Sequence, residues 1–262
     1  MYDRKKRKFV PAAPIRRLWK GMVIDMANIG LLIAGGTGAR MHQDIPKQFL
    51  SVNDKPVIVY TIEAFQQHPE IDAIYIACLN GWQDILEAYV KQFNATKVKR
   101  IVRGGRNGQD SIRNGVYAVA EDFKEDDLIL VHDAIRPMVS ADIISDNIFK
   151  CRKYGNAITV IPCMEAMLKS EDECQSKESI LRNSLFRAQT PQTISVGDAV
   201  AIHKEALEKG ITNSVATCTL LLELGRNVYF AKGSELNIKI TTTDDITIFK
   251  ALLSMQKSAW MK

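Results

Sequence analysis

The sequence has no Cys-x-x-Cys pair among its five cysteines and no zinc-type spacing among its four histidines. A structural zinc site is therefore not expected. The odd number of cysteines also argues against a disulfide framework, and reduced thiols in the cytoplasm fit the sequence best. The cysteines are Cys78, Cys151, Cys163, Cys174 and Cys218, and the histidines are His42, His68, His132 and His203.

The sequence also lacks any run approaching the roughly 18 apolar residues that span a membrane, and it has no secretory signal. Its formal net charge of +5 is uneven, because residues 1–22 carry one acid against Arg4, Lys5, Lys6, Arg7, Lys8, Arg16, Arg17 and Lys20. We expect residues 1–25 to form a basic, disordered extension and residues 26–262 a single domain, with no nucleic-acid or membrane partner. Contact of the extension with RNA or a membrane surface is the less favoured alternative.

Short apolar runs alternate along the chain with segments of helical periodicity. The apolar runs predict strands over residues 29–34, 71–79, 98–102, 127–131, 157–161 and 228–231. The helical segments are 54–67, capped by Asp54, and 82–93, 110–119, 141–153, 197–209, 215–224 and 244–255. This alternation predicts an α/β protein, with a Rossmann-like, mainly parallel sheet and helices on both faces. Residues 163–188 break the pattern, and we expect them to form a projecting arm.

The first predicted strand runs into a glycine-rich loop, LLIAGGTGARMHQDIPKQF, from Leu31 to Phe49. The loop matches neither the Walker pattern nor the dinucleotide fingerprint. Small residues let backbone N–H groups approach an anion closely, and Arg40 and Lys47 add positive charge. An ordinary strand-to-helix turn is the alternative, but two cations in one loop favour phosphate binding.

Four polar motifs follow predicted strands, at the carboxyl ends where ligands bind in parallel sheets. They are the glycine loop with its two cations, Gly104-Gly105 with Asp110-Ser111, Asp133 with Arg136, and Lys239. Each has an ordinary explanation when taken singly, such as an ion pair between Arg136 and Asp133. Together, the cations and the carboxylate indicate a site for a polyphosphate with a divalent metal.

These motifs together resemble the cytidylyltransferases that act on 2-C-methyl-D-erythritol 4-phosphate or ribitol 5-phosphate. The matching segments span about residues 28–256 and are AGGTGARM…PKQF, GGxxxxDS (Gly104 to Ser111), VHDAIRP (Val131 to Pro137), RAQTPQT (Arg187 to Thr193) and NIKITT (Asn237 to Thr242). The resemblance implies transfer of CMP from CTP to a sugar-alcohol phosphate with release of pyrophosphate. It also implies Mg²⁺ as cofactor and a homodimer joined by the arm. In this family the acceptor serves isoprenoid precursor synthesis or wall and capsule polymers.

The resemblance also implies a role for each candidate residue. Arg40, Lys47 and Lys239 would stabilise charge on the α-phosphate and the leaving pyrophosphate, and Asp133 would hold Mg²⁺. Arg182 on the arm would reach the partner's site, the alternative being a solvated loop cation. The other candidate substrate-binding residues are Ala34, Gly35, Gly36, Gly38, Gly104, Gly105, Asp110, Ser111 and Arg136.

The sequence departs from the family pattern at three places. Gly108 stands where many relatives have Arg, and Arg106 is the candidate replacement for that charge. Glu165-Ala166 replaces Asp-Thr, and residues 213–215 replace a Thr-Asp-acid run. The last two changes concern the acceptor side, so the sequence leaves the identity of the sugar alcohol open.

Two other functions remain open at this stage. One is a sugar-phosphate nucleotidyltransferase that uses UTP or GTP, and the other is a CTP-binding protein without turnover. The presence of Arg40, Lys47, Asp133 and Lys239 favours the enzyme over the binding protein.

Overall fold

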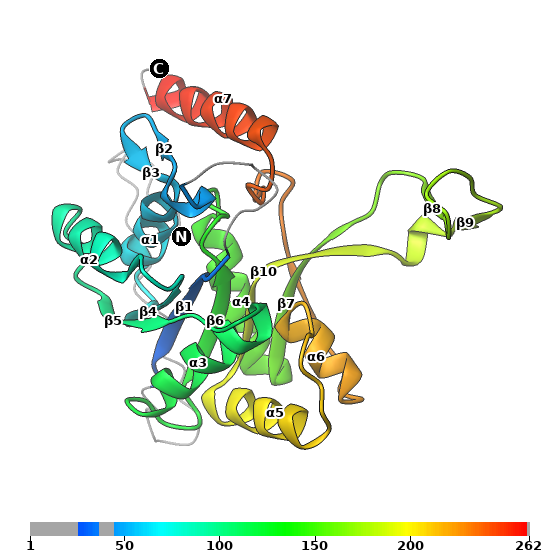
Figure 1. Ribbon diagram of the computed structural model, residues 1–262, viewed down its shortest axis with the longest axis horizontal. Helices are drawn as coiled ribbons and strands as arrows, with labels where there is room; N and C mark the ends of the chain where they lie inside the picture. Colours follow the sequence, from blue (N-terminus) through cyan, green and yellow to red (C-terminus); the bar gives the residue numbers. More distant parts are fainter. Residues whose placement is uncertain (1–25, 37–44, 261–262) are drawn as a thin grey trace, which may run out of the picture.

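The computed structural model describes residues 26–36 and 45–260, with side chains through residue 255. Its centre is a seven-stranded sheet made of β1 (Asn28–Ala34), β4 (Ala73–Cys78), β5 (Val98–Arg103), β6 (Leu128–Asp133), β7 (Asn156–Pro162), β10 (Phe186–Ser195) and β11 (Phe230–Lys232) (Figure 1). The strands lie in the order β11-β7-β10-β6-β1-β4-β5. Neighbouring strands are parallel, except that β10 is antiparallel to β6 and β7. The prediction of a mainly parallel sheet is confirmed.

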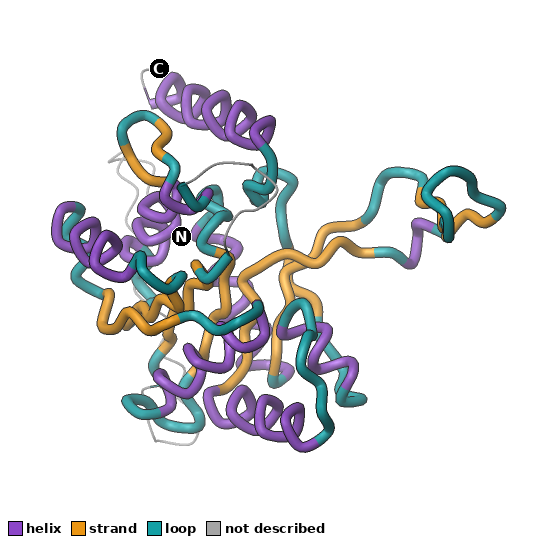
Figure 2. Tube along the Cα trace, viewed as in Figure 1, coloured by secondary structure: helices purple, strands orange, loops and turns teal. Residues whose placement is uncertain are grey.

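Helices cover both faces of this sheet, as predicted (Figure 2). They are α1 (Val57–Gln67), α2 (Gln83–Gln92), α3 (Gly108–Ala120), α4 (Ala141–Tyr154), α5 (Val196–Glu208), α6 (Thr217–Glu223) and α7 (Thr243–Trp260). Alternate residues of β1 enter different cores, because successive side chains of a strand point to opposite faces. Leu32 is buried with side chains of α1, α2 and α4, and Leu31 is buried with those of α3, α5 and α6.

The strand β10 was not predicted from the sequence. Its central residues are buried but polar, and they include Gln189, Gln192 and Thr193. Hydrogen bonds satisfy these side chains, so a strand forms where hydrophobic periodicity gives no signal. The pairing of β10 with β7 shifts register between Ala188 and Gln192, which leaves the residues between them outside the regular ladder.

Two predicted helix starts are wrong. Asp54 does not cap α1, because it has a φ of 60° and lies in the turn between β2 (Ser51–Val52) and β3 (Lys55–Pro56). Helix α1 begins after Pro56 without a side-chain cap. Helix α3 begins at Gly108 rather than Asp110, because the side chain of Asn107 accepts the N–H of Asp110 and caps the helix.

The segment after β7 projects from the body as an arm that returns through β10 (Figure 1). Its outer part holds the hairpin of β8 (Met167–Lys169) and β9 (Glu178–Ile180), followed by the short helix η3 (Arg182–Ser184). Exposed apolar side chains line it: Met164, Met167, Leu168, Ile180, Leu181 and Phe186. The segment thus projects where the sequence predicts an arm, and its part in a dimer stays a prediction. The basic extension predicted for residues 1–25 lies outside the described residues.

Among the described residues, no helix combines the length and apolar character needed to cross a membrane.

Candidate functional site

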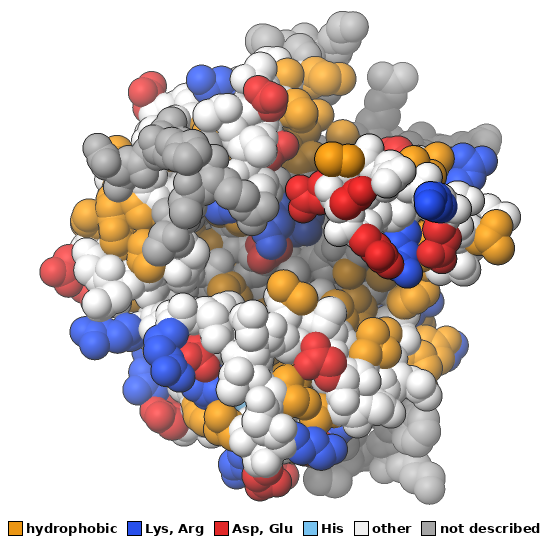
Figure 3. Space-filling model, turned by 45° about the vertical axis from the view of Figure 1, so that its right-hand side comes forward, with side chains coloured by type: hydrophobic (Ala, Val, Ile, Leu, Met, Phe, Trp, Pro, Cys, Tyr) orange, Lys and Arg blue, Asp and Glu red, His pale blue; other side chains and the backbone are white. Residues whose placement is uncertain are grey.

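A cavity of about 230 Å³ opens where β1 and β6 end, at the carboxyl edge of the sheet. Figure 3 shows basic and acidic side chains meeting in a hollow on this side of the molecule. Five of the candidate residues line the cavity: Ala34, Gly36, Lys47, Asp133 and Lys239. Segments separated by about 200 residues thus converge, as the strand-end rule predicts.

The other described candidates are not among the residues that line this cavity. Arg136 is buried and pairs with Asp133, and Gly35 packs against Ser111 and Gly104. There is a second hollow of about 390 Å³. That hollow is lined by Gly104, Gly105 and Asp110, with Asn80, Arg103, Arg106, Arg113 and Asn114. Arg182 is on the arm, and Arg40 and Gly38 lie outside the described residues.

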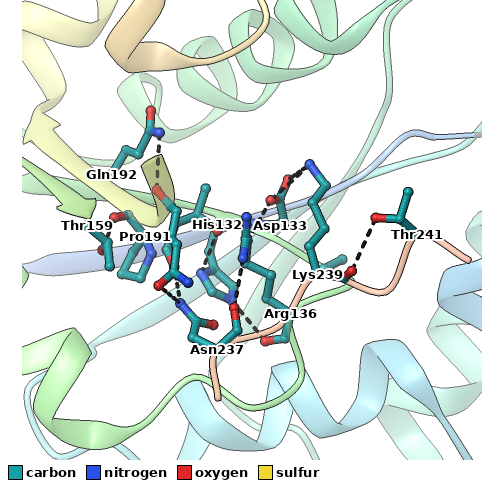
Figure 4. Close-up of polar contacts among 12 residues, drawn as sticks. His132, Asp133, Arg136, Thr159, Pro191, Gln192, Asn237, Lys239 and Thr241 are labelled. Carbon is teal, nitrogen blue, oxygen red and sulfur yellow. Dashed lines mark hydrogen bonds and ion pairs between the residues drawn. The ribbon is translucent and has the colours of Figure 1, made fainter. Parts of the chain in front are cut away.

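The carboxylate of Asp133 pairs with two cations at the cavity (Figure 4). Lys239 Nζ lies 3.1 Å from Oδ2 and 3.3 Å from Oδ1, and Arg136 Nε donates to Oδ2 at 3.0 Å. Burial alone would raise the pKa of Asp133, but Lys239 and Arg136 outweigh it and hold the pKa below its ordinary value. The carboxylate therefore stays ionised, with two cations fixed around it.

His132, the residue before Asp133, is fully buried and forms two hydrogen bonds. Its Nε2 is 3.2 Å from the backbone oxygen of Arg136, and its Nδ1 is 3.1 Å from Thr190 Oγ1. Burial lowers the pKa of His132 to about 4, so the ring is neutral near pH 7. Such a weak base does not suit activation of the Thr190 hydroxyl as a nucleophile.

The loop that carries Lys239 is anchored to this network through Asn237 (Figure 4). Arg136 Nη1 donates to the backbone oxygen of Asn237 at 2.7 Å, and Asn237 Nδ2 donates to the backbone oxygen of Thr190 at 2.9 Å. Arg136 thus holds the Asp133 carboxylate and the Lys239 loop at once. This double contact fixes the distance between the two charged groups.

Lys47 and Gln48 lie on the short helix η2 (Lys47–Phe49), on the glycine-loop side of the cavity. Gln48 Nε2 donates to the backbone oxygens of Ala34 and Gly36, both at 2.9 Å. Lys47 is only 8% exposed. Burial acts to raise the pKa of Asp245, but hydrogen bonds from Thr242 and Thr241, together with the charge of Lys47, lower it overall. Gln48 therefore ties the end of β1 to the element that carries Lys47.

Gly35 and Gly105 allow the two glycine loops to pack against Ser111. A Cβ on Gly35 would lie 2.7 Å from Ser111 Oγ, and one on Gly105 would lie 2.2 Å from the Cβ of Asp110. Ser111 Oγ accepts the N–H of Gly105 at 2.9 Å and donates to the backbone oxygen of Asn107 at 2.8 Å. One lone pair of the Ser111 hydroxyl thus remains for a further donor.

Arg106 does not enter the cavity in place of the family arginine. Its Nε is 3.2 Å from Asp110 Oδ2, and its side chain is 93% exposed beside the second hollow. Gly108 lines the cavity itself, with no atom within 4 Å of the place of a Cβ. Asp110 pairs with both Arg106 and Arg113, so it also braces the start of α3.

The two departures from the family pattern that concern the acceptor, at Glu165-Ala166 and at residues 213–215, lie in different parts of the structure. Ala166 is exposed on the arm, where Arg182 Nη1 donates to the backbone oxygen of Met164 at 2.9 Å. Ser214 is buried and bonded to Thr219 and to Gln109, which makes it part of the fold. Its neighbour Val215 is 85% exposed on the cavity wall.

Sequence reasoning matched the motifs around His132, Thr190, Asn237 and Gln48 but gave these four residues no role. Each lies within one of the matched motifs VHDAIRP, RAQTPQT, NIKITT and PKQF. Membership of these motifs was the only feature of the sequence that could have pointed to them. Their function is visible only from the hydrogen bonds that they form across the fold.

Within the described residues, no group of three or more His, Cys, Asp or Glu side chains could hold a metal ion. Mg²⁺ commonly binds through one or two carboxylates plus phosphate oxygens of a substrate. The ionised Asp133 carboxylate, partly exposed at the cavity, fits that mode of binding. The arrangement is suited to a polyphosphate that neutralises the lysines and brings its own metal ligands.

Comparison with known proteins agrees with this geometry. Residues 29–255 match the family described as IspD, 2-C-methyl-D-erythritol 4-phosphate cytidylyltransferase. A ribitol-5-phosphate cytidylyltransferase of Lacticaseibacillus paracasei is 43% identical over 85% of this chain and 96% of the relative. A 2-C-methyl-D-erythritol 4-phosphate cytidylyltransferase of Clostridium botulinum is 37% identical over 86% of this chain and 97% of the relative. The crystal structure of the Francisella tularensis 2-C-methyl-D-erythritol 4-phosphate cytidylyltransferase superposes with a TM-score of 0.71 and 26% identity, over 85% and 97% of the two chains.

The contacts of Gln48 predict a measurable effect on stability. Gln48→Met keeps the side-chain length but removes both hydrogen bonds, and we expect the free energy of unfolding to fall by about 1–3 kcal/mol. Gln48→Glu should cost more, because it places a carboxylate against two carbonyl oxygens. Urea unfolding measures both, with Gln92→Met at an exposed position of α2 as the control, expected within about 0.5 kcal/mol of wild type. Equal stability of all three variants would show that Gln48 does not tether the loop.

Proposed function

Because the chain belongs to the 2-C-methyl-D-erythritol 4-phosphate cytidylyltransferase family, we propose that it transfers CMP from CTP to ribitol 5-phosphate and releases pyrophosphate. The match over residues 29–255 supports the reaction class. The choice of ribitol rests on one observation, the 43% identity to a ribitol-5-phosphate cytidylyltransferase across almost its whole length. The alternative acceptor is 2-C-methyl-D-erythritol 4-phosphate, which the names of the family and of its solved structures favour.

The reaction needs positioning and charge neutralisation more than covalent chemistry. A phosphate oxygen of the acceptor attacks the α-phosphorus of CTP, and pyrophosphate leaves on the opposite side. Lys47 and Lys239, which line the same cavity, neutralise the charge that develops on the α-phosphate and the leaving group. Arg40 has this role by family resemblance alone.

Mg²⁺ would rest on the Asp133 carboxylate and would neutralise triphosphate oxygens. Asp133 is prepared for this by its lowered pKa, which keeps it ionised. Arg136 and Lys239 hold its two oxygens in place. By family resemblance both cations would also bind the acceptor phosphate, and Lys239 lines the cavity.

The two glycine loops are the proposed site for the cytosine base. The remaining lone pair of Ser111 Oγ can accept a hydrogen bond from the amino group of cytosine. Backbone groups of Ala34, Gly35, Gly36, Gly38, Gly104 and Gly105 would supply the other contacts. Asp110 has an indirect part here, because it holds the helix start that carries Ser111.

The arm is the proposed dimer contact. Its exposed apolar side chains favour burial against a second copy of the chain. Figure 1 shows the arm standing clear of the body, and Arg182 lies in η3 on this arm. In the homodimer Arg182 would bind the acceptor in the partner's site. The five free cysteines support a reducing compartment, and we place the protein in the cytoplasm.

Pyrophosphate release with CTP, Mg²⁺ and each sugar-alcohol phosphate tests the reaction. We expect kcat/KM for ribitol 5-phosphate to exceed that for 2-C-methyl-D-erythritol 4-phosphate by about tenfold or more, because the two acceptors differ in hydroxyl groups that the site must pair. A preference for the erythritol compound would overturn the choice of acceptor. Turnover with GTP or UTP instead of CTP would overturn the choice of nucleotide. If no combination of nucleotide and sugar-alcohol phosphate released pyrophosphate, a CTP-binding protein without turnover would be favoured.

Lys47→Ala and Asp133→Asn should each lower kcat by about a hundredfold or more, because the first removes a positive charge that neutralises the phosphates and the second removes the carboxylate that would hold Mg²⁺. Circular dichroism and thermal unfolding show whether the variants are folded. Lys209→Ala, at a surface pair with Glu205 on α5, is the matched control and should keep the wild-type rate. A normal rate for either site variant removes that residue from the mechanism.

Co-expression tests the proposed contribution of Arg182 to the partner's site. Arg182→Ala and Asp133→Asn should each be impaired alone, whereas mixed dimers have one site with both native residues. Random mixing should then restore about one quarter of wild-type activity, because half of the dimers are mixed and each has one complete site. Absence of recovery in a verified mixed dimer would mean that Arg182 does not act across the dimer.

A further inference from the structure

We propose that His132 is a positioning residue, which fixes the direction of hydrogen bonding at Thr190 so that Thr190 presents only an acceptor lone pair to the sugar alcohol. The inference rests on the proposed function, since it concerns the acceptor half of that site. In this role His132 stays neutral and transfers no proton, and it contributes to substrate recognition only through its hydrogen bonds.

The polarity of the network follows from which atoms can donate. The backbone oxygen of Arg136 can only accept, so the hydrogen of the neutral His132 ring lies on Nε2, 3.2 Å away. His132 Nδ1 then has no hydrogen and can only accept. The hydrogen of the Thr190 hydroxyl, 3.1 Å away, must therefore point at Nδ1.

A second contact occupies another position on the same hydroxyl. The backbone N–H of Asp133 donates to Thr190 Oγ1 at 3.0 Å. A hydroxyl has one hydrogen and two lone pairs, so one lone pair is left. Thr190 lines the cavity, and this lone pair is what it can offer a ligand.

This polarity selects the part of the substrate that Thr190 can bind. An ionised phosphate has only acceptor oxygens and gains nothing from another acceptor. An alcohol hydroxyl of the sugar chain can donate and is the complementary group. Thr190 therefore recognises the polyol part of the acceptor, while Lys239, which lines the same cavity, supplies charge for its phosphate.

Several elements hold His132 in this orientation. Its ring is fully buried and lies 5.1 Å from the ring of Phe65 on α1, measured between centroids. The backbone oxygen of Thr190 accepts from Asn237 Nδ2, which fixes the threonine from its other side. The hydroxyl of Thr190 thus meets the ligand already oriented, which reduces the entropy lost on binding.

Two substitutions of His132 separate its hydrogen bonds. The amide of Asn lies near the place of Nδ1, so His132→Asn can still accept from Thr190 but loses the contact with the Arg136 oxygen. The amide of Gln lies near the place of Nε2, so His132→Gln keeps the Arg136 contact but frees the Thr190 hydroxyl. A purely structural role predicts equal damage from both variants.

Steady-state kinetics with CTP and the sugar-alcohol phosphate tests this difference. For His132→Gln we expect the acceptor KM to rise about tenfold or more, while the CTP KM stays within about threefold of wild type. His132→Asn should raise the acceptor KM less. Wild-type kinetics for His132→Gln, or an equal rise of both KM values together with a lower Tm, would overturn the proposal.

Thr190 variants supply the matched controls. Thr190→Ser keeps the hydroxyl and should stay close to wild type, whereas Thr190→Val removes it and should reproduce the acceptor KM of His132→Gln. The double variant should show little further increase, because both changes remove the same contact. Simple multiplication of the two effects would mean that His132 acts independently of Thr190.

A measurement that needs no turnover separates this inference from the proposed function. Nitrogen NMR of protein labelled at histidine, with His132→Asn used to assign the signal, identifies which ring nitrogen of His132 carries the hydrogen. We expect it on Nε2. Finding it on Nδ1 would contradict the role of His132 alone, whereas wild-type protein inactive with both acceptors would contradict the proposed function.

Discussion

The carboxylate of Asp133 sits between two cations, and the geometry of the site depends on this arrangement. Arg136 follows it by three residues on the same loop, whereas Lys239 lies 106 residues further along the chain. Hydrogen bonds to charged groups contribute about 1.5–3 kcal/mol each when buried, as for Arg136. Lys239 is 42% exposed, so solvent screens its pair and its contribution is smaller. Because Arg136 also bonds the backbone of Asn237, the position of Lys239 is set from two directions.

The same arrangement lowers the electrostatic cost of placing Lys47 and Lys239 at one cavity. Clustered lysines repel one another, and an empty site made of cations alone would be costly to assemble. The ionised Asp133 offsets that repulsion. Under the proposed function, a triphosphate would compete with Asp133 for Lys239, so binding would exchange one ion pair for another.

Much of the fold could be predicted from apolar runs, and the convergence of Lys47, Asp133 and Lys239 from the rule for strand ends. The strand β10 could not, because its buried residues are polar and rely on partners far away in sequence. The predicted helix starts at Asp54 and Asp110 were wrong for local reasons. Asp54 lies in a hairpin turn, and the side chain of Asn107 caps the second helix in place of Asp110. The roles of His132 and Gln48 depend on which atoms they meet, which spacing does not reveal. Arg40 lies outside the described residues, so its predicted part stays a prediction.

The number of residues in the irregular stretch of β10 determines where the side chain of Thr190 points. Thr190 lies in the break between Ala188 and Gln192, outside the regular ladder with β7, and from there its hydroxyl reaches Asp133 and His132. Loss or gain of one residue in this stretch would turn the side chains of the strand to the opposite face. During divergence, the segment should therefore accept substitutions more readily than insertions or deletions.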